Sequence, residues 1–402
     1  MPRILLLTQH FPPEENAPAV RWSWLSDALV MHGFEVKVLT ASWGNGGVEK
    51  PKPGLTIRRI KNTVSGRGIV KRLLNEAIVA SKTFLSIRGQ DRPDVVIASA
   101  PPLTSLPLAR LLAARYHCPL VCDLRDAWPE LLDNWREWNQ DGIDPPKPHR
   151  PRQALFSSVF RVLSRWLQCL QRRAGLVVTT SERYATAVRE RTGKEVICVR
   201  NIPVAAAASY PAPAPSGELR VLYLGNIGRA QHLSTAIRAA ALAKESGAAL
   251  TLRVVGDGAQ AQACRRLAAR LNAPVEFHGR IPRHEVPDHY AWADTILVML
   301  REWYPLTMTV PSKLYEALAS GRHVSASVAG ETADIIASTK AGDIVAPKDP
   351  VALARLWSDL AADRSRLIRP DAGEWLSANT DATLLADRYA TALRALLEDA
   401  TR

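Results

Sequence analysis

Short apolar runs alternate with longer amphipathic segments along most of this chain. The apolar runs of the first half are residues 3–8, 35–41, 56–60, 94–99, 119–125, 175–181 and 196–201. The segments between them, such as residues 19–33 and 103–117, repeat their apolar positions every three or four residues. Nearly continuous aliphatic runs are typical of buried parallel strands, and the intervening periodicity predicts helices. The first half therefore predicts a doubly wound parallel sheet.

The alternation is interrupted once and then starts again. Residues 203–216 read PVAAAASYPAPAPS, an uncharged stretch rich in proline and alanine that is typical of a linker. Strand-like runs return at residue 219, so we expect an α/β fold of two doubly wound Rossmann-like domains that face each other across a cleft. The predicted bounds are 1–203 for the first domain, 204–375 for the second and 376–402 for a last helix that returns to the first domain.

Composition and charge narrow the choice of partners. Of the 402 residues, 47% are hydrophobic and 23% are charged, which is a globular composition. The formal net charge of +13 favours anionic partners such as nucleotide phosphates, a lipid surface or nucleic acid. Because the excess is mostly arginine scattered among alanine and leucine, without the basic runs of a nucleic-acid binder, we expect no nucleic acid partner.

The cysteines and the start of the chain indicate a cytoplasmic protein. Five cysteines stand at irregular spacing, namely Cys118, Cys122, Cys169, Cys198 and Cys264. This spacing predicts reduced core thiols rather than zinc ligands or disulfides. The first apolar run, ILLL, is too short for a signal peptide, and no run approaches the ~20 residues that span a bilayer.

Residues 310–324, VPSKLYEALASGRHV, carry the most informative pattern of the chain. Pro311 favours a helix start, and Gly321 supplies the left-handed stop. Lys313 and Glu316 share one face of this short helix. There the lysine and the free N–H groups of the first turn can meet a diphosphate, and the carboxylate can accept ribose hydroxyls. An ordinary capped helix with a solvated lysine–glutamate pair would give the same pattern.

Three strands of the second half end in small or polar residues. The first is followed by GNIGR at residues 225–229, the second by GDG at 256–258 and the third by GRIP at 279–282. Glycine lets backbone N–H groups approach a phosphate, and Arg229 can clamp one. Glycine after a strand is also ordinary turn chemistry. Three such ends in register, followed by the short helix, favour a nucleotide site.

Polar residues also follow two strands of the first half. Glu14 stands in a proline-stiffened loop after the first strand, where it is available to receive hydroxyl groups or is simply exposed. The segment DLRDAWPE, residues 123–130, is dense in charge for a strand-to-loop junction. We expect a functional role for Asp126. The alternative is a structural pair of Arg125 with Asp126 or with Asp123.

Residues 149–173 contain no acidic residue and predict a basic amphipathic helix. Its apolar stripe comprises Leu155, Val159, Val162, Leu163, Trp166, Leu167 and Leu170. Arginines stand beside this stripe, and the combination suits an anionic lipid interface. A helix packed on the sheet with a solvated basic face would have the same sequence pattern. Both interpretations stay open, and residues 69–88 repeat the theme more weakly.

The order of these motifs resembles a known family. It runs through a PPE loop (residues 12–14), RDAWPE (125–130), LGNIGRAQHL (224–233), VVGDG (254–258), HGRIP (278–282) and PSKLYEALASGRHV (311–324). The chain is similar to retaining nucleotide-sugar glycosyltransferases of the GT-B type, glycosyltransferase family 4. Within that family it resembles the bacterial branch that builds surface polysaccharides such as O-antigen, capsule and exopolysaccharide. The resemblance covers nearly the whole chain.

The resemblance implies a donor site in the second domain and an acceptor site in the first. The implied donor residues are Gly225, Asn226, Arg229, Gly256, Asp257, Arg280, Ile281, Pro311, Ser312, Lys313 and Glu316. The implied acceptor residues are Glu14, Asn16 and Arg125, and the implied catalytic residues are Asp126, Arg229 and Lys313. The resemblance implies no metal and no cofactor, because the cations and the helix N-terminus neutralise the leaving diphosphate.

Some positions depart from the pattern of the family. Met308 stands where many members carry the earlier of two glutamates, and Asn226 and Gln231 stand where arginine and lysine are usual. Glu15 and Asn16 replace a glycine pair in the first loop. These differences concern the contacts to the donor sugar.

Residues and resemblance together predict transfer of a sugar, with retention, from a UDP-linked donor to a glycan or polyprenyl-linked acceptor. We expect a cytoplasmic enzyme that is peripheral to the inner face of the membrane if its basic helix binds anionic lipid. Two alternatives remain: a nucleotide-sugar epimerase or phosphorylase on the same fold, and a non-catalytic nucleotide- or sugar-binding module. An epimerase would turn over the donor without an acceptor, whereas a binding module would neither transfer nor hydrolyse it.

Overall fold

The computed structural model describes most of the chain. The described residues are 1–42, 44, 46–61, 78–79, 81–83, 87, 92–134, 151–203, 210 and 216–401, with backbone only at 133–134 and 151–156. Most of the predicted basic helix at 69–88 and of the predicted linker at 203–216 lies outside the described residues.

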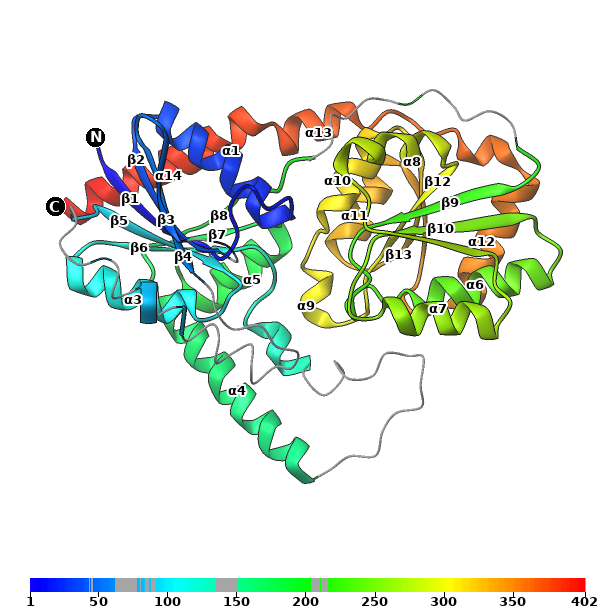
Figure 1. Ribbon diagram of the computed structural model, residues 1–402, viewed down its shortest axis with the longest axis horizontal. Helices are drawn as coiled ribbons and strands as arrows, with labels where there is room; N and C mark the ends of the chain where they lie inside the picture. The colour runs from blue at the N-terminus through cyan, green and yellow to red at the C-terminus, as the bar shows by residue number, and fades with distance from the viewer. Residues whose placement is uncertain are drawn as a thin grey trace. The chain divides into compact units, whose positions relative to one another are not determined.

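The chain folds as two compact units, which Figure 1 shows as separate sheets with their own helices. Unit 1 contains Met1–Asp133, Val159–Asn201 and Asp381–Arg402, and unit 2 contains Asn134–Ser158 and Ile202–Thr380. Each unit is built around its own parallel sheet. The predicted fold class, two doubly wound α/β domains, is confirmed.

The sheet of unit 1 has the strand order β3-β4-β2-β1-β5-β6-β7-β8. Its strands are β1 (Arg3–Leu7), β2 (Glu35–Ser42), β3 (Gly47–Lys52), β4 (Leu55–Lys61), β5 (Val95–Ala100), β6 (Leu120–Leu124), β7 (Leu176–Thr179) and β8 (Val196–Cys198). All neighbouring pairs are parallel except β3 and β4, which are antiparallel. The sequence pattern did not predict β3, because its side chains are mostly exposed and carry no apolar run.

Helices and one 3₁₀ turn complete the described part of unit 1. They are α1 (Ala17–Met31), α3 (Ser105–Tyr116), η1 (Glu130–Asn134), α4 (Pro151–Arg172), α5 (Glu182–Thr192) and α14 (Ala382–Thr401). The first part of α4, up to Ser158, clusters with unit 2, and the rest belongs to unit 1. The last helix packs in this unit, since Arg388 donates to the Cys198 carbonyl at 2.9 Å and Arg394 donates to the His32 carbonyl at 2.8 Å. It begins later than the predicted residue 376, because Asp381 accepts the Leu384 N–H at 2.9 Å and so caps a new helix.

The sheet of unit 2 is parallel throughout, in the order β11-β10-β9-β12-β13-β14. Its strands are β9 (Leu219–Leu224), β10 (Leu250–Val255), β11 (Val275–Gly279), β12 (Thr295–Met299), β13 (His323–Ser327) and β14 (Gly342–Val345). The order reverses between β9 and β12. In open α/β sheets, ligands bind beyond the carboxyl ends of the strands at such a switch point.

Helices cover both faces of the second sheet. They are α6 (Ser234–Glu245), α7 (Ala261–Arg270), η3 (Arg283–Glu285), α8 (Val286–Trp292), α9 (Tyr304–Thr307), α10 (Ser312–Ala319), α11 (Glu331–Thr339), α12 (Pro350–Ala362), η4 (Arg364–Leu367) and α13 (Gly373–Thr380). One core cluster joins the sheet to α6, α7 and α12, and the other joins it to α8, α10 and α11. The burial of both sheet faces explains the apolar runs of β9, β10 and β12 in the middle of the sheet.

The sequence predicted that the cysteines lie in the core, and this prediction is wrong for two of the five. Cys122, Cys198 and Cys264 are buried, Cys118 is half-buried and Cys169 is exposed on α4. All five are free thiols.

Candidate nucleotide site and acceptor-side residues

The short helix α10 begins where the sequence predicts. Pro311 is its extended N-cap with ψ 135°, the helix runs from Ser312 to Ala319, and Gly321 follows with a positive φ of 66°. Its buried face comprises Leu314, Tyr315, Ala317 and Leu318. Burial of this face fixes the helix on the sheet. The first-turn N–H groups, which lack intrahelical acceptors, therefore stand at a defined place beside the strand ends.

Lys313 reaches back from α10 to the end of β9. Its ammonium donates to the Tyr223 hydroxyl at 3.1 Å and lies 4.4 Å from the centre of the same ring. The Tyr223 hydroxyl in turn donates to the Asn226 carbonyl at 2.6 Å. Burial lowers the pKa of Lys313 to about 8, although the charge of Glu316 opposes the shift. Lys313 is thus held beside the first glycine loop, with no hydrogen bond to a carboxylate among the described residues.

Glu316 is oriented by a second tyrosine. The buried Tyr290 of α8 donates its hydroxyl to Glu316 Oε2 at 3.1 Å. Burial and the charge of Glu316 raise the pKa of Tyr290 well above its usual value, so the hydroxyl keeps its proton as a donor. The carboxylate is half-buried and retains acceptor capacity for other donors.

Glycines at the strand ends allow very close backbone packing. A Cβ on Gly256, where φ is 134°, would stand 2.0 Å from the Gly225 carbonyl oxygen. A Cβ on Gly225, where φ is 142°, would stand 2.5 Å from the Lys313 ammonium. The Gly225 N–H donates to the Val255 carbonyl at 2.8 Å, and the Gly256 N–H donates to the Gly279 carbonyl at 2.5 Å. The ends of β9, β10 and β11 therefore meet beside α10, and only glycine fits at these two positions.

The other predicted donor residues lie around the same edge of the sheet. Asn226, Arg229, Asp257 and Arg280 are exposed, and Arg229 makes no hydrogen bond or ion pair within the described residues. Ile281 is half-buried and packs against the core cluster that contains α10. The edge thus offers one fixed cation, exposed polar groups and an apolar side chain, which are the features that a nucleoside diphosphate needs.

The segment before α10 contains two neighbouring aromatic residues, of which one is buried and the other is exposed. Trp303 is buried and lies under Arg301, with the guanidinium 4.9 Å from its ring centre, whereas Tyr304 is 71% exposed. Met308, at the position of the missing earlier glutamate, is buried. Of these residues, only Tyr304 is open to a sugar.

In unit 1, Asp126 follows β6, and its carboxylate makes few contacts with the rest of the fold. The residue is half-buried, and no hydrogen bond to its carboxylate is found in the part of the chain that the structure describes. Burial raises the pKa of Asp126, and the charge of Arg125 opposes the shift. A carboxylate held this way can accept a hydroxyl proton more readily than an exposed one.

Arg125 does not form the structural pair with aspartate that was the predicted alternative. Its guanidinium donates to the Pro101 carbonyl, and its own carbonyl accepts the Thr180 hydroxyl at 2.8 Å. Asp123 pairs instead with Arg21 of α1 at 2.9 Å, and both side chains are fully buried. The predicted Arg125–Asp123 pair is therefore wrong, because Arg21 reaches the aspartate from a helix distant in sequence.

The loop after β1 forms a small polar cluster. Glu14 accepts from the Asn16 amide at 2.9 Å and lies in close contact with the His10 ring. The amide oxygen of Asn16 accepts the Ala19 N–H at 3.0 Å and so caps α1. Asn16 thus has a local structural role. His10 is not among the residues predicted from the sequence, although it stands four residues before Glu14.

The apolar stripe predicted for α4 divides between two faces of the helix. Phe160, Ser164 and Leu167 are buried, whereas Val159, Val162 and Trp166 are 53%, 67% and 48% exposed. Positions 160, 164 and 167 recur at helical spacing on one side, and 159, 162 and 166 recur on another. A single stripe is therefore the wrong description: one face is core and the other is open. No helix in the described ranges is long and apolar enough to cross a bilayer.

Family models match both halves of the chain. Residues 16–201 match the Glycosyl transferase 4-like domain, and residues 218–363 match the Glycosyl transferases group 1 domain. Each half of the chain thus matches a glycosyltransferase domain model. These matches agree with the GT-B resemblance seen in the motifs.

Individual relatives are distant. The chain is 27% identical to the probable glycosyltransferase WbjE of Pseudomonas aeruginosa over 347 residues, which are 85% of this chain and 84% of the relative. It is 28% identical over 194 residues to the putative colanic acid biosynthesis glycosyltransferase WcaL of Escherichia coli, covering 47% of this chain and 48% of the relative. Both relatives are named as glycosyltransferases, and the second is named for colanic acid biosynthesis.

A solved structure has the same fold. Anabaena HepE in complex with UDP-glucose superposes with a TM-score of 0.66 at 16% identity, over 98% of this chain and 99% of that chain.

Proposed function

We propose that this chain, each half of which matches a glycosyltransferase domain model, transfers a sugar with retention from a UDP-linked donor to a glycan or polyprenyl-linked acceptor of a bacterial surface polysaccharide. The observation that carries the proposal is the arrangement of α10: Lys313 and Glu316 are each held by a tyrosine hydroxyl beside the glycine ends of β9 and β10. The HepE complex with UDP-glucose supports a uridine nucleotide as the donor class.

Each group of unit 2 has a proposed role in donor binding. The diphosphate binds the first-turn N–H groups of α10, the Lys313 ammonium and the exposed Arg229 guanidinium. The ribose hydroxyls donate to Glu316, and the base lies against the backbone near Arg280 and Ile281. These groups favour a dianionic diphosphate over a neutral sugar, because their charges are fixed before the ligand arrives.

The reaction that we propose is front-face substitution. The acceptor hydroxyl oxygen attacks the anomeric carbon on the side that the diphosphate leaves, so that the new C–O bond replaces the sugar–phosphate bond with retention. The bonding electrons stay on the departing diphosphate, and one of its oxygens takes the acceptor proton. Lys313 contributes most here, because negative charge on the diphosphate grows as the bond breaks.

Asp126 is the proposed contribution of unit 1. Its carboxylate, which is half-buried and lacks a hydrogen bond within the described residues, would accept the acceptor hydroxyl and orient it for attack. Glu14 and Arg125 are the further acceptor-side candidates. Glu14 has lone pairs beyond its contacts to His10 and Asn16. Arg125 donates one N–H to the Pro101 carbonyl, and its Nε–H is buried without a partner in the described residues.

The stereochemistry of the product tests this reaction. The purified chain is incubated with UDP-sugars and a polyprenyl diphosphate sugar acceptor, and the new anomeric bond is assigned by NMR. Retention of the donor configuration is the expected result. An inverted product would contradict the mechanism, and donor turnover without acceptor would indicate an epimerase.

We also propose that the open face of α4 binds anionic membrane. Val159, Val162 and Trp166 form an exposed apolar strip, and Arg161 and Arg165 are exposed beside it. Tryptophan and aliphatic side chains can enter the headgroup region while arginines pair with lipid phosphates.

The two faces of α4 provide a matched test of membrane binding. Replacing Val162 and Trp166 with Ser should abolish binding to phosphatidylglycerol vesicles and leave the melting temperature unchanged. The control, Phe160→Ser on the buried face, should lower the melting temperature. Unchanged vesicle binding by the Val162/Trp166 variant would overturn the membrane proposal and leave the transfer reaction unaffected.

A further inference from the structure

A pocket lies at the edge of the unit 2 sheet opposite to the glycine ends. Its floor is formed where β12 and β13 begin, at Asp294, Arg322 and His323, and its wall is formed by Arg364 and Arg369 from the segment after α12. The cavity has a volume of about 230 Å³. The amino ends of parallel strands lie at the opposite edge from their carboxyl ends, so this pocket is separate from the proposed donor site.

The arginines that line the pocket outnumber its carboxylates. Arg364 pairs with the buried Asp294 at 2.7 Å, and that carboxylate also pairs with Arg220 at 3.2 Å. Arg322 has no carboxylate partner in the described part of the chain. Its guanidinium donates to the Tyr290 and Ala291 carbonyls at 3.2 and 3.1 Å, in the last turn of α8. The direct hydrogen bonds of Arg322 are therefore to backbone carbonyls, and the nearby Asp294, which already pairs with two other arginines, acts on its charge without an ion pair.

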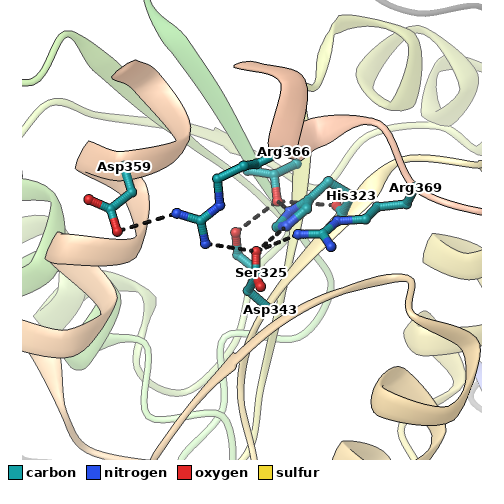
Figure 2. A network of polar contacts seen from close by, with 7 residues as sticks. His323, Ser325, Asp343, Asp359, Arg366 and Arg369 are labelled. Atoms are coloured by element: carbon teal, nitrogen blue, oxygen red, sulfur yellow. Dashed lines mark hydrogen bonds and ion pairs between the residues drawn. The ribbon is translucent and has the colours of Figure 1, made fainter. Parts of the chain in front are cut away.

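Arg369 is fixed by a polar network beneath the pocket. Figure 2 shows Arg366, Arg369 and His323 converging on the Asp343 carboxylate. Arg369 donates to Asp343 Oδ2 at 2.6 Å, and His323 Nε2 lies 3.0 Å from the same oxygen. These contacts use one end of the Arg369 guanidinium. Its Nε–H is buried and unpaired in the structure as described.

The pocket therefore presents unused guanidinium donors in a rigid setting. Nη1 of Arg322 and both Nε and Nη1 of Arg369 make no hydrogen bond within the described residues. Guanidinium groups match the oxygens of phosphate in geometry as well as in charge.

We propose that this pocket is a second anion site, which binds the phosphate group of a small phosphate monoester between Arg322, Arg364 and Arg369. The cavity is smaller than the ~300–1,000 Å³ of sites that enclose drug-sized ligands. A phosphate group fits inside it, and the remainder of the ligand would extend past Ile368, which is 81% exposed. This site does not depend on the proposed transfer reaction.

Glycerol phosphate is the probe, and its binding to the full-length chain is measured by calorimetry with glycerol as the uncharged reference. Arg322→Gln and Arg369→Gln should each weaken binding roughly 10- to 100-fold, the range for a lost hydrogen bond to a charged group. Arg270→Ala removes an exposed arginine of α7 and should leave the affinity unchanged. Lys313→Ala should also leave it unchanged, because Lys313 belongs to the other edge.

Two controls keep the test decisive. Arg322 also caps α8, so the melting temperature of each variant is measured, and Arg369→Gln carries the test if Arg322→Gln is unfolded. Absence of glycerol phosphate binding by the wild-type chain would overturn the proposal. Binding that is weakened by Lys313→Ala and not by the pocket variants would also overturn it, while supporting the donor site.

Discussion

The two units differ in what their strand ends leave for a ligand. In unit 2, the tyrosines Tyr223 and Tyr290 hold Lys313 and Glu316 by their hydroxyls, and Arg229 stays exposed. The fold therefore orients these polar groups by hydrogen bonds to neutral hydroxyls, which do not neutralise their charges. The glycine ends of β9 and β10 bring the backbone close enough for this arrangement.

In unit 1, the fold uses most of the corresponding polar groups itself. Asp123 pairs with Arg21, Arg125 donates to the Pro101 carbonyl, and Asn16 caps α1. The carboxylate of Asp126, by contrast, accepts no hydrogen bond within the described residues. The difference teaches that charge density at a strand end does not by itself indicate a ligand site, since buried arginines and helix caps require polar partners as well.

The largest expected effect is on turnover in Lys313→Ala. This change should lower turnover roughly 10²–10³-fold, or about 3–4 kcal/mol of activation free energy, because the missing cation acts on charge that grows in the transition state. The affinity for UDP should fall less than the turnover does. Steady-state kinetics and calorimetry measure the two quantities, with Lys244→Ala on the exposed surface of α6 as control. Equal losses in both would place Lys313 in ground-state binding only.

Close packing of the glycine ends predicts a large loss of stability in Gly256→Ala. The new Cβ would stand 2.0 Å from the Gly225 carbonyl oxygen at a φ of 134°, so the free energy of unfolding should fall by about 3 kcal/mol. Gly247→Ala is the matched control, since its φ of 85° is also positive but no atom lies within 4 Å of the new Cβ. It should lose only about 1 kcal/mol. Similar losses in chemical denaturation would show that packing at Gly256 is unimportant.

The sequence predicted the elements that depend on local signals, but not the contacts between residues that are far apart in the chain. The strands and α10 were readable because apolar periodicity and the Pro311 and Gly321 signals are local. The partners Tyr223 and Tyr290 were not, because each belongs to an element distant in sequence from α10 and meets it only in the folded unit.

The acceptor side and the arginine pocket show the same limit. Arg21 lies far in sequence from Asp123, so the nearer Arg125 was the wrong partner. The pocket combines Arg322 with Arg364 and Arg369 across α11, β14 and α12, a separation that no motif spans. In α4 the sequence also contained the information for two faces. The prediction grouped the apolar residues into one stripe without asking which positions lie on the same side of the helix.

A smaller effect on turnover, with no effect on donor binding, is expected in unit 1. Asp126→Asn should lower turnover roughly 10²-fold, or about 2.7 kcal/mol, because a neutral amide accepts a weaker hydrogen bond from the acceptor hydroxyl and orients it less well for attack. The affinity for UDP should not change, because the proposed nucleotide contacts all lie in unit 2.

The pH profile sharpens this assignment. Burial raises the pKa of Asp126, so its carboxylate becomes protonated at a higher pH than that of an ordinary aspartate. As the pH is lowered, the wild-type rate should therefore begin to fall at this higher pH. The Asp126→Asn rate should lack that step. A variant with wild-type turnover would remove Asp126 from the reaction.

The smallest expected effect is the pH dependence of nucleotide binding. The pKa of Lys313 is lowered to about 8, so the free enzyme loses this charge as the pH rises through that value. UDP affinity should therefore be highest below pH 8 and fall about tenfold by pH 9, since only the protonated lysine attracts the diphosphate. Lys313→Arg should bind UDP with little change over the same range. A flat wild-type profile in calorimetry would show that Lys313 does not contact the phosphates.

The central claim is that α10 of unit 2 holds the donor nucleotide, and titration of the full-length chain with UDP tests it most directly. Glu316→Ala should weaken binding by roughly 1–3 kcal/mol, the range for a lost charge-assisted hydrogen bond. Tyr290→Phe, which leaves the carboxylate in place without its hydroxyl partner, should weaken binding less. Glu245→Ala on the exposed end of α6 should bind as the wild type does. If all four proteins bound UDP with the same affinity, the nucleotide would not lie on α10 and the account would be contradicted.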